Sequence, residues 1–412
     1  MTAIAEEITR TEPKTTATAI SGVVDLGDGR GFLRTAGYRR SAGDIPISPA
    51  QVRQYGLRTG DYIEGTAGSR PGKARQDQAR QDQARQDQAR QDQARQDKGR
   101  PDQALLSVES VSGLPAAEAA ARPDFDQLTP VYPNQRFRLE DGDPSPAARI
   151  IDLVSPIGKG QRGLIVAPPK AGKTTVLKTI AHAITTAYPD VHLMLVLVGE
   201  RPEEVTDLRR SVRGEVISST FDQSPADHVL AAELAIERAK RLAELGRDVV
   251  VMLDSLTRLG RAYNLAAPAS GRTLSGGVAA SALQPPRQFL GAARCLEEGG
   301  SLTILSTALI DTGSQLDNVL FEEFKGTGNM ELRLRRDLAE KRLFPAIDPV
   351  PSGTRREDLL LDPAEHAAVI SLRRALAALD PQHALELLLE KATVPNSEFL
   401  RQVRQSANPG RP

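Results

Sequence analysis

The sequence predicts an α/β domain built on a parallel sheet, preceded by a small all-β barrel. Beyond residue 149, continuous apolar runs alternate with helical patterns, as expected of buried parallel strands joined by crossover helices. Residues 20–67 instead hold short alternating apolar stretches broken by Gly-Asp turns, which is typical of a small β-barrel. The length of 412 residues suits two or three domains.

The composition excludes several classes of protein. Forty per cent of the residues are apolar, which is enough for a buried core. Lys plus Arg and Asp plus Glu both number 53, so any surface that binds nucleic acid must be local. The single cysteine, Cys295, excludes a disulfide scaffold and a Cys-rich zinc site. Without a long apolar run or a secretory signal pattern, we expect a cytoplasmic protein that does not enter a membrane.

Less regular segments should flank and join the two domains. We expect a disordered arm at the amino end, a Pro- and Ala-rich connector and a short tail. The expected boundaries are 1–19 for the arm, 20–112 for the barrel, 113–148 for the connector, 149–400 for the α/β domain with its C-terminal helices, and 401–412 for the tail. The expected parallel strands are 163–167, 192–198, 248–253 and 301–305, with helices at 174–188 and 225–245.

A low-complexity insertion interrupts the barrel at residues 74–98. It repeats Ala-Arg-Gln-Asp-Gln with a period of five, and its last copy ends in Lys98. This period presents no continuous apolar face on a helix or on a strand, so we expect a disordered polar loop. A solvated helix that binds a partner is the alternative, because acid-to-base pairs such as Asp77 and Arg80 recur at i,i+3.

The strongest chemical signal is the segment Ala167-Pro-Pro-Lys-Ala-Gly-Lys-Thr174, between an apolar strand and a helix. This is the context of a phosphate-binding loop, although Ala167 replaces its first glycine. Gly172 and the loop amides can face phosphate oxygens at a helix N-terminus. Lys173 can reach the β- and γ-phosphates, and the Thr174 hydroxyl can hold Mg²⁺.

Two carboxylates follow neighbouring strands of the predicted sheet. Asp254 ends the strand 248–253, and Glu200 follows the strand 192–198. Ligands of open α/β sheets bind at the carboxyl ends of the strands, so both side chains should lie near Lys173. Asp254 could hold Mg²⁺, and Glu200 could orient an attacking water. The sequence therefore predicts a nucleoside triphosphatase that uses ATP and Mg²⁺.

Several motifs together resemble the bacterial transcription termination factor Rho family, across about residues 125–400. They are 163–174, 200–205, 253–258, 261–264, 291–294, 297–303, 308–314 and 322–332. The resemblance implies a RecA-like P-loop motor domain after an OB-fold, cold-shock-like RNA-binding domain. It further implies a homohexameric ring that hydrolyses ATP, moves 5′ to 3′ on single-stranded nascent RNA and dislodges the transcript from RNA polymerase.

The resemblance also implies roles residue by residue. Glu200 would be the catalytic glutamate and Asp254 the magnesium ligand. Arg355 would be an arginine finger that reaches the neighbouring subunit's ATP, and Phe344 would pack on adenine. The implied nucleotide contacts are Gly158, Lys159, Gly160, Gln161, Arg162, Gly163, Lys170, Ala171, Gly172, Lys173, Thr174, Thr175, Arg201 and Phe344.

In the barrel, the resemblance assigns RNA contacts but also shows departures from the family. Phe32 would stack on a base, and Arg34 and Asp44 would make polar contacts. Arg30 and Pro46 stand where the family has aromatic residues. A stacked base is worth ~1–3 kcal/mol, so we expect a weakened primary RNA site.

The pore loops and one position near the active site also differ from the family pattern. Arg272 and Lys325 would be basic RNA contacts in the ring's pore. Gln315 stands where the second pore loop usually has Lys, and Gly199 where the family usually has Asp. Two alternatives follow. One is a divergent paralogue that binds RNA and modulates termination; the other is a rotary ATP synthase catalytic subunit, whose catalytic Glu also lies in a Gly-Glu-Arg context.

Overall fold

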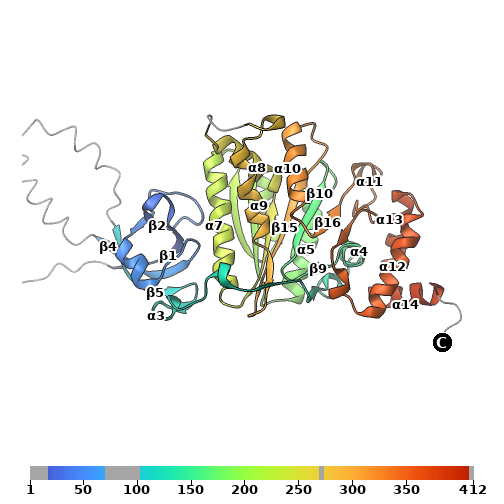
Figure 1. Cartoon of the computed structure of the whole chain (residues 1–412), viewed down its shortest axis with the longest axis horizontal. Coiled ribbons are helices and arrows are strands. Elements are labelled where there is room, and N and C mark those ends of the chain that lie inside the picture. Colours follow the sequence, from blue (N-terminus) through green and yellow to red (C-terminus); the bar gives the residue numbers. More distant parts are fainter. Residues whose placement is uncertain (1–16, 70–102, 269–272, 408–412) are drawn as a thin grey trace, which may run out of the picture. The chain divides into compact units, whose positions relative to one another are not determined.

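The computed structural model describes residues 17–69, 103–268 and 273–407. Contacts divide the chain into two compact units, Met1–Ala121 and Arg122–Pro412, which Figure 1 shows as ribbons. Most of the predicted arm, the repeats at 74–98, Arg272 and the last five residues lie outside the described residues. No helix in the described part of the chain is long and apolar enough to cross a membrane.

The first unit is an antiparallel sheet in the order β3-β2-β1-β4-β5-β6, which confirms the predicted all-β domain. Its strands are β1 (Thr18–Asp25), β2 (Gly31–Arg34), β3 (Ile45–Ile47), β4 (Tyr62–Ser69), β5 (Gln103–Val111) and β6 (Leu114–Pro115). Alternate residues such as Val24, Leu33 and Ile63 fill the core. Because β1 begins at Thr18, the arm is shorter than predicted.

Two short helices complete this unit, α1 (Pro49–Tyr55) and α3 (Ala116–Ala119). Ser48 and Gln51 form a capping box that fixes the start of α1. The helix ends at Gly56, whose φ of 58° is left-handed and suits glycine.

The second unit contains the predicted parallel sheet, in the order β12-β11-β13-β15-β10-β16-β17. All neighbours are parallel except β17, which runs antiparallel to β16. The strands are β10 (Arg162–Ala167), β11 (His192–Glu200), β12 (Glu215–Thr220), β13 (Asp248–Asp254), β15 (Ser301–Leu309), β16 (Met330–Arg333) and β17 (Gly353–Thr354). Two short strands, β14 (Arg294–Leu296) and β7 (Pro130–Val131), extend antiparallel from β15, and β8 (Arg136–Phe137) and β9 (Ile157–Gly158) form a separate two-stranded sheet.

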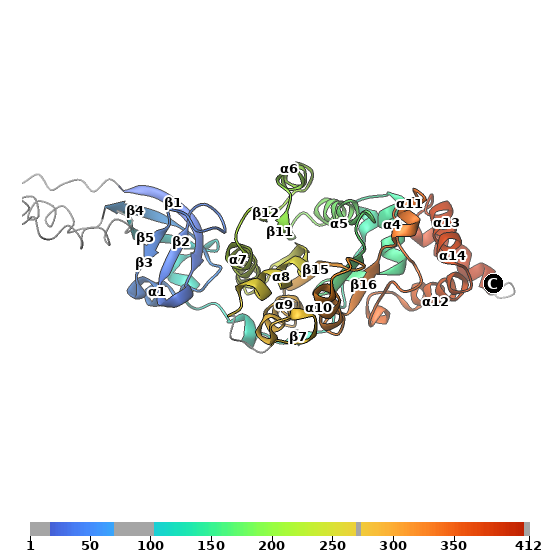
Figure 2. The ribbon, with the colours of Figure 1, turned by 90° about the horizontal axis from the view of Figure 1, so that it is seen from above.

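Helices cover both faces of this sheet, so its central strands are buried on both sides. Figure 2 shows α5 and α6 on one side and α8, α9 and α10 on the other. The helices are α4 (Pro146–Val154), α5 (Lys173–Ala187), α6 (Pro202–Ser211), α7 (Pro225–Ala243), α8 (Leu256–Ala266), α9 (Gln284–Gly291), α10 (Gln315–Lys325), α11 (Arg336–Glu340), α12 (Pro363–Ala377), α13 (Pro381–Lys391) and α14 (Asn396–Ala407). Helix α14 continues into the segment predicted to be a tail.

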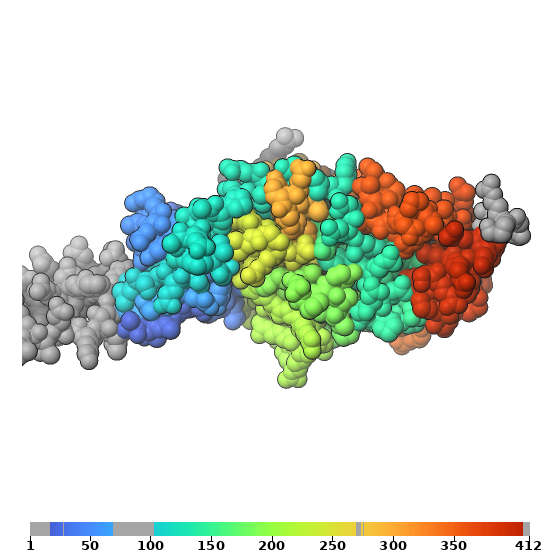
Figure 3. Space-filling view, turned by 90° about the horizontal axis from the view of Figure 1, so that it is seen from below, coloured from blue at the N-terminus to red at the C-terminus, as the bar shows by residue number. Residues whose placement is uncertain are grey.

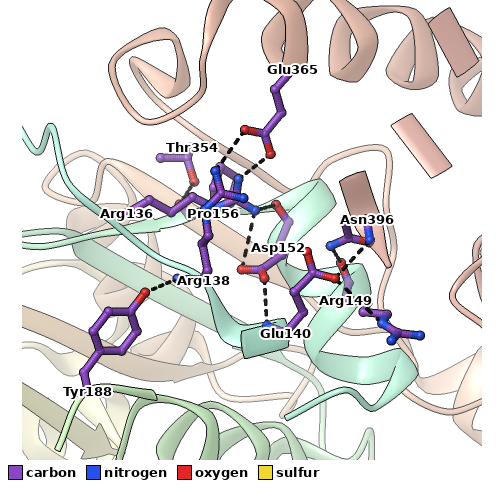
Figure 4. Close-up of polar contacts among 10 residues, drawn as sticks. All are labelled: Arg136, Arg138, Glu140, Arg149, Asp152, Pro156, Tyr188, Thr354, Glu365 and Asn396. Carbon is purple, nitrogen blue, oxygen red and sulfur yellow. Dashed lines mark hydrogen bonds and ion pairs between the residues drawn. The ribbon is translucent and has the colours of Figure 1, made fainter. Parts of the chain in front are cut away.

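A buried polar network ties the connector and α4 to the C-terminal helices (Figure 4). The Arg136 guanidinium donates to Glu365 of α12 at 2.7 Å and lies 3.6 Å from Asp152 of α4. The backbone N–H of Asn396 donates to Glu140 at 2.9 Å. Because these side chains are largely buried, each depends on its partners for polar contacts.

Asp152→Asn should remove a pH dependence of folding stability. Burial, opposed by the Arg136 charge, raises the pKa of Asp152 from 3.8 to about 6. Between these values the folded chain binds a proton that the unfolded chain releases, so the wild type gains stability as the pH falls. Its free energy of unfolding should rise relative to the variant's by ~1.4 kcal/mol between pH 7 and pH 5. Denaturant unfolding at both pH values measures this, and parallel pH dependences would refute it.

Candidate active site

The phosphate loop connects the carboxyl end of β10 to the start of α5. Ala167 is the last residue of the strand, and Gly172, with φ 89°, precedes the helix. No side chain caps α5, so its first backbone N–H groups face outward without an intramolecular side-chain acceptor. Such a helix end attracts phosphate. Lys170 and Thr175 are exposed beside the loop, and Ala171 is buried beneath it.

Three predicted side chains meet at this edge of the sheet. The Lys173 ammonium lies 3.0 Å from a Glu200 oxygen and 2.5 Å from Asp254 Oδ1. Glu200 and Asp254 are almost fully buried, at the carboxyl ends of β11 and β13. Thr307 of β15 donates a hydrogen bond to Asp254 at 2.7 Å. The sheet topology thus brings together residues that lie far apart in the sequence.

Neighbouring charges oppose the effect of burial on the pKa values of Lys173 and Asp254. Burial alone would lower the pKa of Lys173, but the charges of Asp254 and Glu200 raise it. Burial raises the pKa of Asp254, and the Lys173 charge opposes that shift. A second cation is near Glu200, because Arg258 Nη1 lies 3.4 Å from its other carboxylate oxygen. The two buried carboxylates therefore depend on nearby cations.

A backbone irregularity aims Glu200 into the site. The pairing of β11 with β12 shifts register between Val198 and Glu200, and Gly199 has φ 66°. The Arg258 guanidinium also donates to the Gly199 carbonyl. Arg201, by contrast, is exposed and points to Glu204 at 3.9 Å. No role for Arg258 was predicted from the sequence, although its position in the first turn of the helix after Asp254 is a usable signal.

The donor set at this edge fits Mg²⁺. The half-buried Thr174 hydroxyl and the Asp254 carboxylate are oxygen donors next to the phosphate-binding helix end. Mg²⁺ is usually held by one or two such groups plus phosphates and water. No cluster of three or more His, Cys, Asp or Glu side chains occurs within residues 17–69, 103–268 and 273–407.

Phe344 lies beside the phosphate loop. Its ring is 3.6 Å from the position that a Cβ on Gly172 would take, and its side chain is half-exposed. An exposed aromatic face at this place could stack on a base.

Arg355 lies at the opposite edge of the same sheet. It follows β17, and its backbone N–H donates to the Asn329 carbonyl at 2.8 Å, just before β16. Met330 pairs with Gly163 near the amino end of β10, whereas the phosphate loop leaves the carboxyl end. The strand has six residues, so these ends are ~20 Å apart. Arg355 does not reach Lys173 of its own subunit.

Residues 158–163, which the resemblance assigns to nucleotide contacts, lie at the same end of the sheet as Arg355. They lie at the amino end of β10, before the strand crosses the sheet, an edge that Figure 3 views from below. Lys159 pairs with Asp248 at 2.6 Å, and Gln161 is buried against Asn329. Gly160 packs closely on the Cys295 backbone.

In the barrel, the predicted polar RNA contacts form an internal network. The Arg34 guanidinium donates to Asp25 at 2.9 Å and pairs with Asp44 at 2.5 Å, and all three residues are buried. The same guanidinium lies 5.1 Å from the Phe32 ring centre. Arg34 and Asp44 therefore support the ring rather than present free charges. Pro46 lies opposite Phe32 in the sheet.

Among the described residues, the remaining predicted RNA contacts, Arg30, Gln315 and Lys325, are exposed. Arg30 precedes β2 with no ion pair among the described residues. Gln315 begins α10 and Lys325 ends it, so one helix carries two of the three predicted pore residues. The residues at position 315 and position 325 lie near opposite edges of the sheet, because α10 leads from the end of β15 to the start of β16.

Comparisons with known proteins identify both units. The nucleotide-binding domain of the ATP synthase alpha/beta family matches residues 147–354, and the RNA-binding domain of the Rho termination factor matches residues 20–116. The transcription termination factor Rho of Streptosporangium roseum is 55% identical over 389 residues, which cover 94% of this chain and 92% of that protein. The chain belongs to the Rho family.

Other relatives are longer than this chain. The Rho of Micrococcus luteus is 56% identical over 389 residues, which cover 94% of this chain but 54% of that protein. The chain thus spans about half the length of that Rho. Among solved structures, an ATPase from the type III secretion system of pathogenic bacteria has a TM-score of 0.54 and 26% identity, covering 68% of this chain and 81% of that one. The predicted motor fold is confirmed, and the Rho RNA-binding domain argues against an ATP synthase subunit.

Lys173→Ala should abolish ATP hydrolysis, because it removes the cation that Glu200 and Asp254 hold at the phosphate-binding helix end. Lys178→Ala is a matched control on the same helix, where the ammonium pairs with Asp207 at the surface. Steady-state phosphate release from both variants measures the effect. Turnover by Lys173→Ala within tenfold of the control would contradict the assignment of this loop.

Proposed function

We propose that the protein is an RNA-dependent ATPase and helicase. It assembles as a homohexameric ring, moves 5′ to 3′ on single-stranded nascent RNA and releases that RNA from RNA polymerase in the cytoplasm. The observation that carries this proposal is the separation of Arg355 from Lys173 across the sheet. A finger that does not reach its own nucleotide can complete a neighbour's site in a ring.

The chain's own residues supply most of the chemistry at the phosphate loop. The N-terminus of α5 binds the polyphosphate, which competes with Glu200 and Asp254 for the Lys173 ammonium. Thr174 and Asp254 would hold Mg²⁺, which would supply positive charge to the phosphate oxygens. Once the polyphosphate has drawn Lys173 away, Glu200 accepts a hydrogen bond from the attacking water and orients it.

Helix α8 provides a physical link from this site toward α10. It begins at Leu256, directly after the strand that ends in Asp254, and carries Arg258 against Glu200. One turn later, Arg261 makes two hydrogen bonds to the buried Asp317 of α10, at 2.7 and 2.6 Å. Movement of RNA along the ends of α10 could thus change the position of Arg258.

The barrel binds RNA in this proposal, with a primary site weaker than usual in the family. Phe32 remains as a stacking face, but Arg30 and Pro46 replace aromatic residues. A purely modulating paralogue is not favoured, because high identity to named termination factors extends over 94% of the chain.

Arg355→Ala should bind ATP but lose hydrolysis by ~10³-fold or more, because the finger stabilises charge on the transferred phosphoryl group. Its mixture with Lys173→Ala should regain activity, since interfaces with an intact loop from one subunit and an intact finger from the other then form. Mixed rings, refolded or co-expressed, are compared with each variant alone. Failure of the mixture to exceed both parents would refute a shared site.

Arg30→Tyr should tighten binding of an oligocytidine and make it less sensitive to salt. The change exchanges an exposed phosphate-binding charge for a stacking face. Losing one phosphate contact should lower the salt slope by ~0.7 log units per tenfold salt. Titrations of both full-length proteins at several salt concentrations measure this. Weaker binding by the variant at high salt would be the opposite result, and Arg53→Tyr on α1 is the matched control.

A further inference from the structure

Asn329 lies where the start of β16 meets the amino end of β10. Its side-chain Oδ1 accepts hydrogen bonds from the Arg162 backbone N–H at 2.8 Å and from Gln161 Nε2 at 2.6 Å. Its own backbone N–H donates to the Arg162 carbonyl at 2.9 Å. The regular pairing of the two strands starts one residue later, at Gly163 and Met330. The Asn329 side chain therefore adds hydrogen bonds between the two segments next to the point where β10 and β16 begin to pair.

The same residue anchors the arginine finger. The Asn329 carbonyl accepts a hydrogen bond from the Arg355 backbone N–H at 2.8 Å, and also from Gln161 Nε2 at 3.2 Å. Gln161 is only 1% exposed, so its amide depends on Asn329 for these bonds. The place from which Arg355 leaves the sheet is thus fixed by the hydrogen bonds around Asn329.

Charge at this edge directs the finger outward. Arg162 donates to the carbonyls of Ala293 and Thr327, both at 3.1 Å, and the Arg294 guanidinium lies over the Phe125 ring at 4.6 Å. Burial, and then the charges of Arg294 and Arg355, lower the pKa of Arg162. Among the described residues, none of these three arginines has an ion pair with a carboxylate. A group of unpaired cations repels Arg355 toward solvent and attracts a polyanion.

We propose that Asn329 is a positioning residue for the Arg355 finger and acts on the neighbouring subunit's ATP site rather than on its own. The inference rests on the proposed shared site. A displacement of ~1 Å in a catalytic group can cost ~10²-fold in rate. Asn329→Ala should therefore lower the hydrolysis rate constant by ~10²-fold while ATP affinity changes little, because the phosphate loop lies at the far end of β10.

The test is complementation in mixed rings of full-length chains, measured as single-turnover hydrolysis with limiting ATP. Asn329→Ala is mixed 1:1 with Lys173→Ala, so only ATP bound to the Asn329→Ala subunits is hydrolysed. About half of those loops then face an intact Arg355 and Asn329 from a Lys173→Ala neighbour. We expect a fast phase of about half the amplitude, at the wild-type rate, that is missing in Asn329→Ala alone. A fast phase cannot arise if Asn329 acts within its own subunit.

Two controls separate the possible failures. The Arg355→Ala with Lys173→Ala mixture reports the shared site itself; if it shows a fast phase and the Asn329→Ala mixture does not, the positioning role is wrong. If neither mixture does, the shared site is wrong and the inference falls with it. Asn396→Ala, which removes another buried amide that donates to the Arg149 carbonyl, should lower thermal stability but retain the wild-type rate constant.

A second variant covers the case in which Asn329→Ala does not fold. Gln161→Met keeps the side-chain volume but removes the Nε2 donor to Asn329 Oδ1 and to its carbonyl. The same fast phase should appear when this variant is mixed with Lys173→Ala. A slow single phase in that mixture, beside a complementing Arg355→Ala control, would overturn the proposal.

Discussion

The length of β10 is the constraint on which the rest of this structure depends. The strand delivers Lys173 to one edge of the sheet, while Arg162, Asn329 and Arg355 gather at the other. No side-chain rotation spans ~20 Å, so Arg355 and Lys173 of one chain lie too far apart to contact the same phosphate group. The topology produces this separation, because the parallel strand β10 ends at the phosphate loop, whereas β17 runs antiparallel and ends at the opposite side, directly before Arg355.

At the end of the sheet that carries the phosphate loop, nearby cations compensate the charges of the buried carboxylates Glu200 and Asp254. Glu200 and Asp254 share the Lys173 ammonium, and Arg258 supplies a second positive charge to Glu200. A buried charge without a partner would cost several kcal/mol. A polyphosphate that draws Lys173 away therefore changes the environment of both carboxylates at once. Binding of a polyphosphate and the charge environment of Glu200 and Asp254 are thus linked through the Lys173 ammonium.

The elements that could be predicted from the sequence are those with a strong local pattern of residue types. The apolar strands β10, β11, β13 and β15 and the phosphate loop follow from runs and spacing. It missed β12, whose residues alternate, and β16, which is short and charged. It could not place Asn329 or Arg258, because their partners come from distant strands, nor pair Arg34 with Asp25, which depends on the β1–β2 register. The remote position of residues 158–163 likewise follows only from the sheet.

The central claim is that catalysis belongs to the interface between subunits. Sedimentation of the 44.4 kDa chain with ATP and RNA, with phosphate release measured in each fraction, tests it most directly. The account predicts that hydrolysis is confined to assembled rings and that turnover per subunit falls on dilution to monomers. Undiminished turnover by a species of monomer mass would contradict it.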